Sequence, residues 1–512
     1  MSSVPRHTVS RGVQQCERNE DDIVHAIESR VSWSLRLLPV LIAVPFALFI
    51  SQTHPSTSLL AAVAAVPLLI AFVSPMSGLY LLVFSMLLGP EFLVGGMGSG
   101  NTLGRGVTLR FDDVLLMLVG IGWLGRVAVS DHGKVFVRTS LNRPIMLYTA
   151  ACVFATLIGI MAGRVHPMGG LFFLLKYYEY FFLFFMTVNL VKTKEQVKHL
   201  VTASLVTCFL VSLYAISQIP SGMRVSAPFE GQDGEPNTLG GYLVFTMALI
   251  GGLLVTPGAV QAKWLLGALL AVGGFALQAT LSRASFLAAG VVLVGLILFL
   301  CRRSLGLVAV VLVGCIALAV LAPRSVVERM TYTFSQPEEK GQIQVGSLHV
   351  DTSTSERIQS WSHSFEIWRT SPLWGQGVTG GPFMDAMYPR VFVEVGLLGA
   401  CAFAALLYAL FRMGKVSSAH FEDPYLRGLA LGFLFGFVGL LIHALGSNTF
   451  IIVRIMEPFW LVAGLLVKSQ LMDQHERESI DDHGFQPAPA AQSKMLFGSS
   501  LPRPQSFPGR AL

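Results

Sequence analysis

The chain has 512 residues, of which 53% are hydrophobic and only 13% are charged. Soluble globular proteins are about 25% charged, so this composition excludes a disordered chain and disfavours a soluble multidomain enzyme. The net charge of +6 is typical of a membrane protein with basic cytoplasmic loops. No cluster of basic and aromatic residues indicates a nucleic-acid partner.

The sequence predicts three parts. Residues 1–36 are polar and predict a cytoplasmic N-terminal tail without a cleavable signal peptide. Residues 37–468 predict one multi-pass membrane domain. Residues 469–512 are polar, then rich in proline, serine and alanine, and predict a disordered cytoplasmic C-terminal tail.

The membrane domain is expected to be an all-α, polytopic transmembrane bundle of about 12–14 helices. Apolar runs alternate with short polar breaks, and a helix needs about 20 apolar residues to cross a bilayer. The expected spans, in chain order, are 37–50, 58–73, 77–94, 113–129, 144–161, 168–191, 200–219, 239–255, 264–280, 285–301, 305–321, 391–411, 425–445 and 450–468.

The basic residues of the short loops predict the orientation. If the N-terminus starts in the cytoplasm, most loop lysines and arginines fall on the cytoplasmic side, as the positive-inside rule requires. Both termini are then cytoplasmic. The basic residues left in the short outer loops are few: Arg105, Arg110, Arg164, Arg224 and Arg283.

The longest loop, residues 323–390, is predicted to lie outside the cytoplasm and to contain a helix. Ser353 and Glu356 form a capping box, in which the two side chains bind the first free N–H groups of a helix. One apolar face follows at spacings of three and four residues, formed by Ile358, Trp361, Phe365 and Trp368. Pro372 ends the helix, and a glycine-rich turn leads back to the membrane. The helix either rests on the membrane or bundle, or caps an active site.

Several common catalytic motifs are missing from the sequence. There is no nucleotide-binding loop, no HExxH motif, no Asp-x-Asp pair and no GxSxG elbow. The six cysteines form no CxxC motif and no His/Cys cluster, so neither disulfides nor a zinc site are expected. The sequence therefore predicts no metal and no cofactor, and the substrate of any enzyme here is expected to need neither ATP nor a sugar nucleotide.

Charged residues occur within the apolar spans. They are Glu91, Lys176, Glu179, Glu394, Arg454 and Glu457. Charges inside a membrane are costly and indicate functional sites. The alternative for Lys176/Glu179 and Arg454/Glu457, each three residues apart, is an ion pair on one helix face.

Two arginines are expected on the outer side. Arg224 lies in a polar loop, and Arg283 lies in Leu281-Ser282-Arg283-Ala284-Ser285, where one span ends and the next begins. Because the guanidinium fork grips phosphate oxygens in pairs, the two arginines suit a lipid-linked phosphate or pyrophosphate. The alternative is that both extend to lipid headgroups.

Four stretches together resemble the bacterial O-antigen ligase and O-antigen (exopolysaccharide) polymerase superfamily. They are Arg110-Phe111-Asp112-Asp113; Pro228-Phe229-Glu230-Gly231 with Glu235-Pro236-Asn237-Thr238-Leu239-Gly240; Leu281-Ser282-Arg283-Ala284-Ser285; and Arg357-x3-Trp361 with Ser371-Pro372-Leu373-Trp374-Gly375-Gln376-Gly377 and Glu394-Val395-Gly396-Leu397-Leu398-Gly399.

Members of this superfamily transfer a glycan from undecaprenyl diphosphate at the periplasmic face of the inner membrane. The resemblance implies that Arg224 and Arg283 hold the donor diphosphate and that the long outer loop is the catalytic lid. It also implies the partners: a lipid-linked glycan donor, a glycan or lipid A–core acceptor, the lipid bilayer and a chain-length regulator.

The chain departs from the ligases at one place. Ligases carry a His-Asn pair before the Glu-x-Gly-x-x-Gly motif, whereas residues 384–388 here contain no histidine. Asp385 is the candidate base, since a carboxylate can accept a proton from an attacking hydroxyl, and His363 is the other candidate. Glu394 completes the catalytic candidates. The candidate substrate-binding residues are Arg357, Trp361, His363, Asn237, Gly375 and Gly377.

The sequence thus predicts a glycosyltransferase that polymerises repeat units of O-antigen or exopolysaccharide. An O-antigen ligase, which transfers the glycan to lipid A–core, is the alternative within the superfamily. A polysaccharide or lipid transporter or flippase is the alternative from another class. Buried charges favour it, but the sequence shows no internal repeat of the kind common in transporters.

Overall fold

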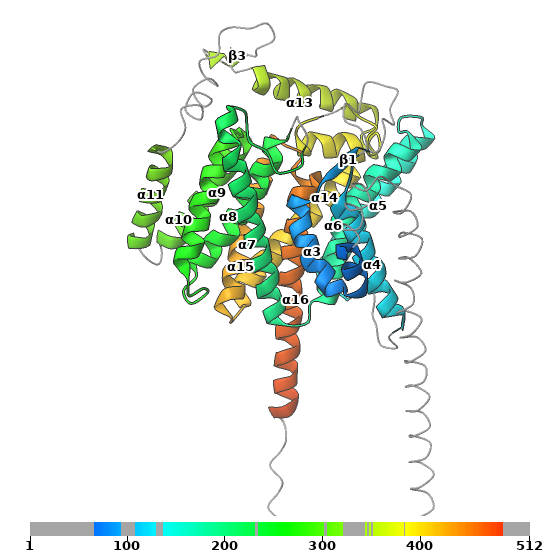
Figure 1. The fold of residues 1–512 in the computed structure, drawn as a ribbon. Helices are drawn as coiled ribbons and strands as arrows, with labels where there is room; N and C mark the ends of the chain where they lie inside the picture. The colour runs from blue at the N-terminus through cyan, green and yellow to red at the C-terminus, as the bar shows by residue number, and fades with distance from the viewer. Residues whose placement is uncertain are drawn as a thin grey trace, which may run out of the picture. The chain divides into compact units, whose positions relative to one another are not determined.

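The computed structural model describes residues 66–93, 108–129, 137–230, 234–301, 305–320, 344–345, 348–349, 352–382 and 384–484. The expected span 37–50 and the tail 1–36 lie outside these residues. The chain divides into two units, Met1–Gln470 and Leu471–Leu512, and the first contains the bundle (Figure 1). This unit confirms the predicted all-α, polytopic fold.

The helices follow the predicted order of spans. They are α3 (Pro75–Leu88), α4 (Phe111–Val129), α5 (Asn142–Met161), α6 (Pro167–Leu190), α7 (Lys194–Ser217), η1 (Ile219–Ser221), α8 (Pro236–Val255), α9 (Lys263–Ala279), α10 (Arg283–Cys301), α11 (Leu305–Val320), α13 (Thr352–Thr370), α14 (Met387–His420), α15 (Pro424–His443), η2 (Thr449–Ile451) and α16 (Val453–Gly484).

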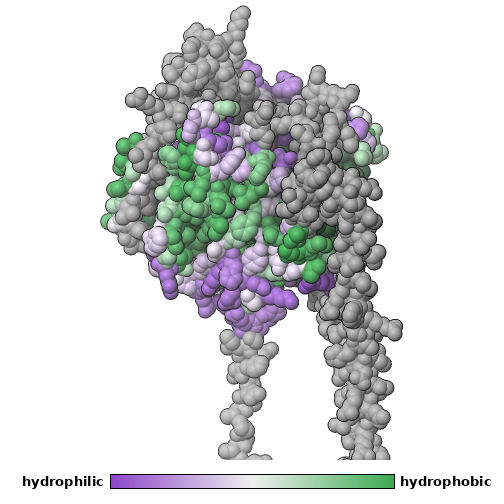
Figure 2. Space-filling view, in the orientation of Figure 1, coloured by the Kyte–Doolittle hydropathy of each residue, from purple (hydrophilic) through white to green (hydrophobic). Residues whose placement is uncertain are grey.

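Within the described residues, eight helices are long and apolar enough to cross a membrane, namely α5, α6, α7 with η1, α8, α10, α14, α15 and α16. Hydrophobic side chains form a band across the visible face, with hydrophilic side chains above and below it (Figure 2). On α10, Leu287, Val294 and Leu298 are each more than half exposed. Lipid is the environment in which such a surface is stable.

The core of the bundle lies where α8, α15 and α16 meet. Phe459 of α16 packs against both Phe245 and Phe433, with ring centroids 5.4 and 5.0 Å away. Helices α8 and α15 approach closely at Gly252 and Gly432, since a Cβ on Gly252 would lie 2.3 Å from the Gly432 nitrogen. Small residues let transmembrane helices pack backbone to backbone.

One end of the bundle carries α13, which packs against α14 (Figure 1). We call it the α13 end. The short antiparallel strands β1 (Glu91–Leu93) and β2 (Thr108–Arg110) pair between α3 and α4, with Glu91 opposite Arg110. Strands β3 (Gln344–Val345) and β4 (Leu348–His349) pair in the segment before α13.

The helix in the long loop is confirmed as α13, which ends at Thr370 just before Pro372. Its expected apolar face is not buried as a whole, because Trp361 and Phe365 are 41% and 51% exposed. Ser364 is buried instead, and its hydroxyl donates a hydrogen bond to the Met384 sulfur. The side chains of the predicted capping box lie outside the described residues.

Helix α16 (Val453–Gly484) runs beyond the expected end of the last span. The last span was expected to end at Lys468, with a disordered tail from residue 469, but the helix continues to Gly484. The segment 469–484 contains no proline or glycine before its last residue, so nothing in its backbone chemistry interrupts the helix. The remaining tail residues lie outside the described part.

Candidate functional site

Two helix N-termini meet at the α13 end. Helix α8 begins at Pro236 and helix α10 at Arg283. The Ser282 hydroxyl donates to Asn237 Oδ1 over 2.7 Å and joins the two ends. The first N–H groups of each helix lack helical partners and carry a partial positive charge. The junction therefore favours a negatively charged ligand.

The two predicted arginines lie beside this junction. Arg224 Nε donates to the Thr280 carbonyl over 3.1 Å, and the backbone N–H of Val225 reaches the Ala279 carbonyl. The loop that carries Arg224 therefore runs along the turn that leads into Arg283. Arg224 is exposed and Arg283 is partly exposed, which keeps both guanidinium groups near the surface of this turn.

A chain of polar side chains leads inward from the junction. We call it the polar chain: Asn237, Ser282, Ser285, His443 and Thr449. Ser285 Oγ donates to Ser282 Oγ over 2.8 Å and lies 3.1 Å from His443 Nε2. His443 Nδ1 lies 2.8 Å from Thr449 Oγ1. All except Asn237, which is partly exposed, are buried.

Consecutive glycines of α8 make room for the polar chain. A Cβ on Gly240 would lie 2.1 Å from Ser285 Oγ, and a Cβ on Gly241 would lie 3.0 Å from His443 Cε1. Side chains at these positions would displace the serine and crowd the histidine. Gly240 is the last residue of the Pro-Asn motif. A glycine stands there because any side chain would occupy the space of Ser285.

Asp385 lies next to the segment that carries His443. It is exposed, in the bend between α13 and α14. On its two sides, the Asn448 amide donates to the Met384 carbonyl over 2.5 Å, and the Met387 N–H donates to the Ala444 carbonyl over 3.1 Å. The candidate base thus lies at the α13 end, on a segment fixed from both sides.

Glu394 is buried and fully engaged. Its carboxylate accepts hydrogen bonds from Arg390 Nε over 3.0 Å, the Tyr177 hydroxyl over 3.2 Å and the Thr379 N–H over 3.3 Å. The bond from the Thr379 N–H fixes the glycine-rich turn onto α14, and the bond from Tyr177 connects α14 to α6. The geometry gives Glu394 a positioning role, because its oxygens already have donors and the residue is 6% exposed.

Gly375 and Gly377 lie in the same turn. Gly375 has a φ of +75° and Gly377 a φ of +90°, a region that other residues adopt only at a cost. A Cβ on Gly375 would lie 2.5 Å from the Glu394 carbonyl oxygen. The Gly377 N–H donates to that oxygen over 2.8 Å. The two glycines therefore shape the loop.

We call residues 279–283, with Arg224 beside them, the arginine turn. Two other candidates, His363 and Trp361 on α13, make no described contact with it. His363 is exposed, with Nδ1 3.7 Å from Glu366 Oε2 on its own helix. Trp361 is also exposed. The side chain of Arg357 lies outside what the structure describes.

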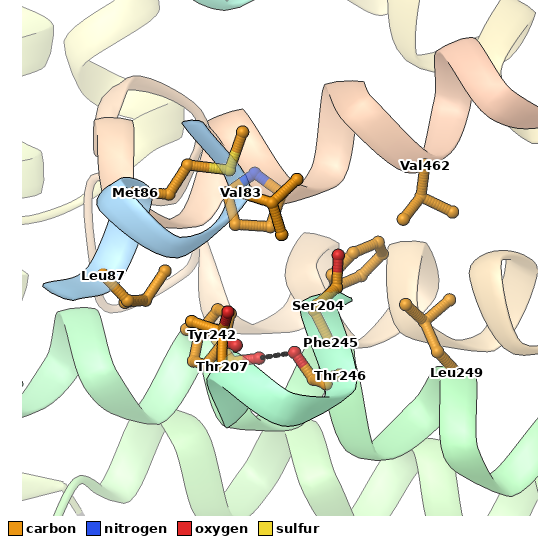
Figure 3. Close-up of a pocket in the computed structure, with 11 residues that line it drawn as sticks. Val83, Met86, Leu87, Ser204, Thr207, Tyr242, Phe245, Thr246, Leu249 and Val462 are labelled. Carbon is orange, nitrogen blue, oxygen red and sulfur yellow. Dashed lines mark hydrogen bonds between the residues drawn. The ribbon is translucent and has the colours of Figure 1, made fainter. Parts of the chain in front are cut away.

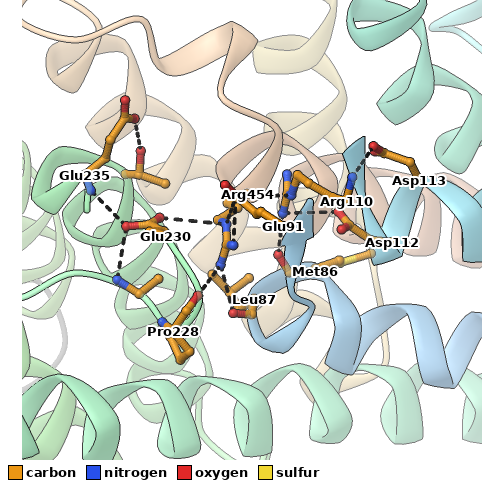
Figure 4. Close-up of polar contacts among 12 residues, drawn as sticks. Met86, Leu87, Glu91, Arg110, Asp112, Asp113, Pro228, Glu230, Glu235 and Arg454 are labelled. Carbon is orange, nitrogen blue, oxygen red and sulfur yellow. Dashed lines mark hydrogen bonds and ion pairs between the residues drawn. The ribbon is translucent and has the colours of Figure 1, made fainter. Parts of the chain in front are cut away.

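A largely buried network of ion pairs and hydrogen bonds connects several elements at the α13 end (Figure 4). Arg454 Nη2 lies 2.9 Å from Glu91 Oε1, and Arg454 Nη1 donates to the carbonyls of Leu87 and Pro228 over 2.9 and 3.0 Å. Arg110 Nη2 lies 3.1 Å from Asp112 Oδ2. These contacts connect α3, β2, α4, α16 and the loop before α8.

Glu230 organises that loop. Its Oε2 accepts from the N–H groups of Ala227 and Glu235, and its Oε1 lies 3.8 Å from Arg454 Nε. Burial raises the pKa of Glu230 to about 7, and the nearby Arg454 partly opposes this shift. The Pro-Phe-Glu-Gly motif is thus the anchor of the loop between Arg224 and Asn237.

The two predicted helix-face ion pairs have different outcomes. Lys176 pairs with Glu179 at 3.3 Å, as expected, and also with Asp113. Arg454 does not pair with Glu457 among the described contacts, since its guanidinium faces Glu91 and Glu230 on other elements. Residues distant in sequence compete for the same charge, which helix spacing alone does not reveal.

A narrow cavity opens among α3, α7, α8 and α16 (Figure 3). Its lining is mostly apolar, with Leu87, Phe245 and Val462 among its residues. The room for water-sized molecules is about 10 Å³, which is about one water. None of its lining residues is a predicted site residue, so we regard it as a packing gap.

Sequence reasoning missed His443, Arg390 and Tyr177. An ionisable residue within an apolar span is itself a signal, and it would have identified His443 at the end of the span 425–445. No sequence pattern indicates that Tyr177 donates to Glu394, because the two residues lie on different helices.

Residues 266–444 match the family model described as O-antigen ligase. The match includes Arg283, Asp385, Glu394 and His443, while Arg224 precedes it. No curated protein is significantly similar to the chain. The match supports the O-antigen ligase and polymerase superfamily that the sequence motifs resemble, and with it glycosyl transfer of the ligase or polymerase type.

Proposed function

We propose that this chain, which carries the O-antigen ligase domain over residues 266–444, polymerises lipid-linked repeat units of O-antigen or exopolysaccharide. The donor is an oligosaccharide on undecaprenyl diphosphate, and the acceptor is a second repeat unit. The reaction takes place at the periplasmic face of the inner membrane, which we assign to the α13 end.

The observation that carries this proposal is the junction of α8 and α10 beside Arg224 and Arg283. Two helix N-termini and two arginines bring positive charge to one surface, where the Glu235 carboxylate at the N-cap of α8 also lies. As the sugar–phosphate bond breaks, the electron pair of that bond moves onto the leaving diphosphate. Preorganised positive groups stabilise this developing charge and lower the barrier.

Asp385 is the proposed base. It would accept the proton of the acceptor hydroxyl while the hydroxyl oxygen forms a bond to the anomeric carbon. Its exposure and its position at the α13 end support this role. Glu394 supports the site indirectly, because it holds the turn between α13 and α14.

An O-antigen ligase is the second candidate. The family model that matches residues 266–444 is itself described as O-antigen ligase, which favours transfer to lipid A–core. Against it stands the absence of a histidine in residues 384–388.

Reconstitution separates the two candidates. The purified protein is placed in liposomes with undecaprenyl-diphosphate-linked repeat units, with and without lipid A–core, and products are resolved by gel electrophoresis. We expect chain growth with repeat units alone. Transfer that occurs only with lipid A–core would identify a ligase, and no transfer in either mixture would contradict both and favour a transporter.

A further inference from the structure

We propose that His443 is a positioning residue for the donor diphosphate. Through the two serines of the polar chain, it orients the amide N–H groups of Asn237 toward the surface of the arginine turn. The inference rests on the proposed function, since it concerns the same donor site. No sequence motif singled out His443, and the chemistry proposed above does not use it.

The hydrogen atoms along the polar chain can be assigned one by one. A serine hydroxyl has a single hydrogen to donate. Ser282 donates its hydrogen to Asn237 Oδ1, and Ser285 donates its hydrogen to Ser282. The contact of 3.1 Å between Ser285 Oγ and His443 Nε2 therefore needs a hydrogen from the histidine.

This assignment fixes the tautomer of His443. With the hydrogen on Nε2, the neutral ring keeps Nδ1 as an acceptor. Thr449 Oγ1 lies 2.8 Å from Nδ1 and supplies the matching hydrogen. Every contact from Thr449 to Asn237 then has one donor and one acceptor.

The opposite tautomer would reverse every bond. With the hydrogen on Nδ1, His443 would accept from Ser285, Ser285 from Ser282, and Ser282 from the Asn237 amide nitrogen. The carbonyl oxygen of Asn237 would then face outward, where it repels a phosphate oxygen. In the observed arrangement, Asn237 Nδ2 has no acceptor among the described residues and is free to donate to an anion.

The surroundings of the polar chain favour this arrangement of hydrogen bonds. His443, Thr449 and Ser285 are each 0% exposed and Ser282 is 1% exposed, so water does not compete for these bonds. Gly240 and Gly241 leave the space that the serine and the imidazole occupy. Asn237 follows Pro236, the first residue of α8, which has no N–H, so the side-chain amide of Asn237 lies beside the first backbone N–H of that helix.

The test measures binding of undecaprenyl diphosphate to the purified full-length protein in nanodiscs. His443→Leu removes both ring nitrogens, and Ser285→Ala interrupts the chain with a smaller change. Because a hydrogen bond to a charged group contributes roughly one to two factors of ten in affinity, each variant should bind at least about tenfold more weakly. Wild-type affinity in both variants would overturn the proposal.

His443→Gln is the conservative variant. Its amide nitrogen can donate to Ser285 as Nε2 does, so binding should stay within about threefold of wild type. A loss as large as that of His443→Leu would contradict a positioning role. Thr187→Val is the matched control, because this buried hydroxyl donates only to Leu183 in its own helix, and its binding should not change.

A double-mutant cycle distinguishes positioning from general packing. If His443 acts through Asn237, then His443→Leu should weaken binding no further once Asn237→Ala is present. Additive losses would show that His443 acts elsewhere. Arg283→Ala tests the donor site separately: if that variant alone loses binding while His443→Leu does not, only the positioning inference fails, whereas wild-type binding by Arg283→Ala removes the donor site itself.

Discussion

At the residue scale, the arginines of the α13 end divide into two groups. Arg454 is 3% exposed and Arg110 is 5% exposed, and both bind acidic side chains and backbone carbonyls. Arg224 and Arg283 lie near the surface of the turn before α10. An intramembrane charge is therefore a starting point for a functional hypothesis, and its burial helps to separate an anchoring role from ligand binding.

Asp385→Asn tests the proposed base. The amide keeps the size of the side chain but does not accept a proton, so turnover should fall about 10²- to 10⁴-fold. Binding of undecaprenyl diphosphate should remain unchanged. Polymer formation and lipid binding are measured on the same preparation. Glu195→Gln, an exposed carboxylate at the start of α7, is the matched control, and full activity of Asp385→Asn would remove the role.

Glu230 predicts a pH dependence of stability. Its folded-state pKa is raised to about 7 from an ordinary value of 4.5, so the stability linked to its protonated form is complete below pH 4.5 and is lost as the pH rises through 7. Glu230→Gln does not ionise. The difference in melting temperature, variant minus wild type, should therefore increase between pH 5 and pH 8. A difference that stays constant with pH would contradict this account.

At the element scale, the spans could be predicted because apolar length is sufficient to identify a transmembrane helix. The helix in the long loop was also predictable, from its spacing and from Pro372. The break inside α14 was not. Gly396 has a φ of +63°, and the residues around it bond to the loop before Gly377, as in the Leu397 N–H to the Pro372 carbonyl. That pairing depends on contacts between two distant motifs.

Gly396→Ala tests this junction. A Cβ at residue 396 would lie 2.5 Å from the Gly375 nitrogen and from the Leu373 carbonyl, and the positive φ adds strain. We expect a destabilisation of about 2 kcal/mol or more, measured as a lower melting temperature, with loss of polymer formation.

Gly290→Ala is the matched control for that variant. It lies in α10, and a Cβ there would meet no atom within 4 Å. Alanine is the better helix former by roughly 0.5–1 kcal/mol, so this variant should be as stable as wild type or slightly more stable. If Gly396→Ala behaves in the same way, the junction is not the constraint that we describe.

At the scale of the whole molecule, individual residues of the candidate site could be predicted from the sequence. Which of them lie together in space could not. Arg224, Arg283 and Asn237 were identified from motifs, and the structure places the three beside one junction. His443 comes to the same end because α15 returns there, and Glu394 is already occupied by donors. Which residues meet depends on how helices pack, and short motifs carry no such information.

Cysteine labelling tests the orientation of the bundle. Ser362 is exposed on α13 and Lys415 is exposed in the second half of α14. In a background with serine at Cys301 and Cys401, the exposed cysteines of the described residues, Ser362→Cys should react with an impermeant maleimide in spheroplasts. Lys415→Cys should react only after the membrane is permeabilised. The reverse pattern would place the α13 end in the cytoplasm.

The most direct test of the central claim is polymer formation by Arg283 variants in liposomes with undecaprenyl-diphosphate-linked repeat units. Lysine keeps the charge of arginine but lacks its planar fork of donors. We predict that Arg283→Ala and Arg283→Lys both insert into the membrane and form little or no polymer. Polymer at the wild-type rate from Arg283→Ala would contradict the claim that this turn holds the donor diphosphate.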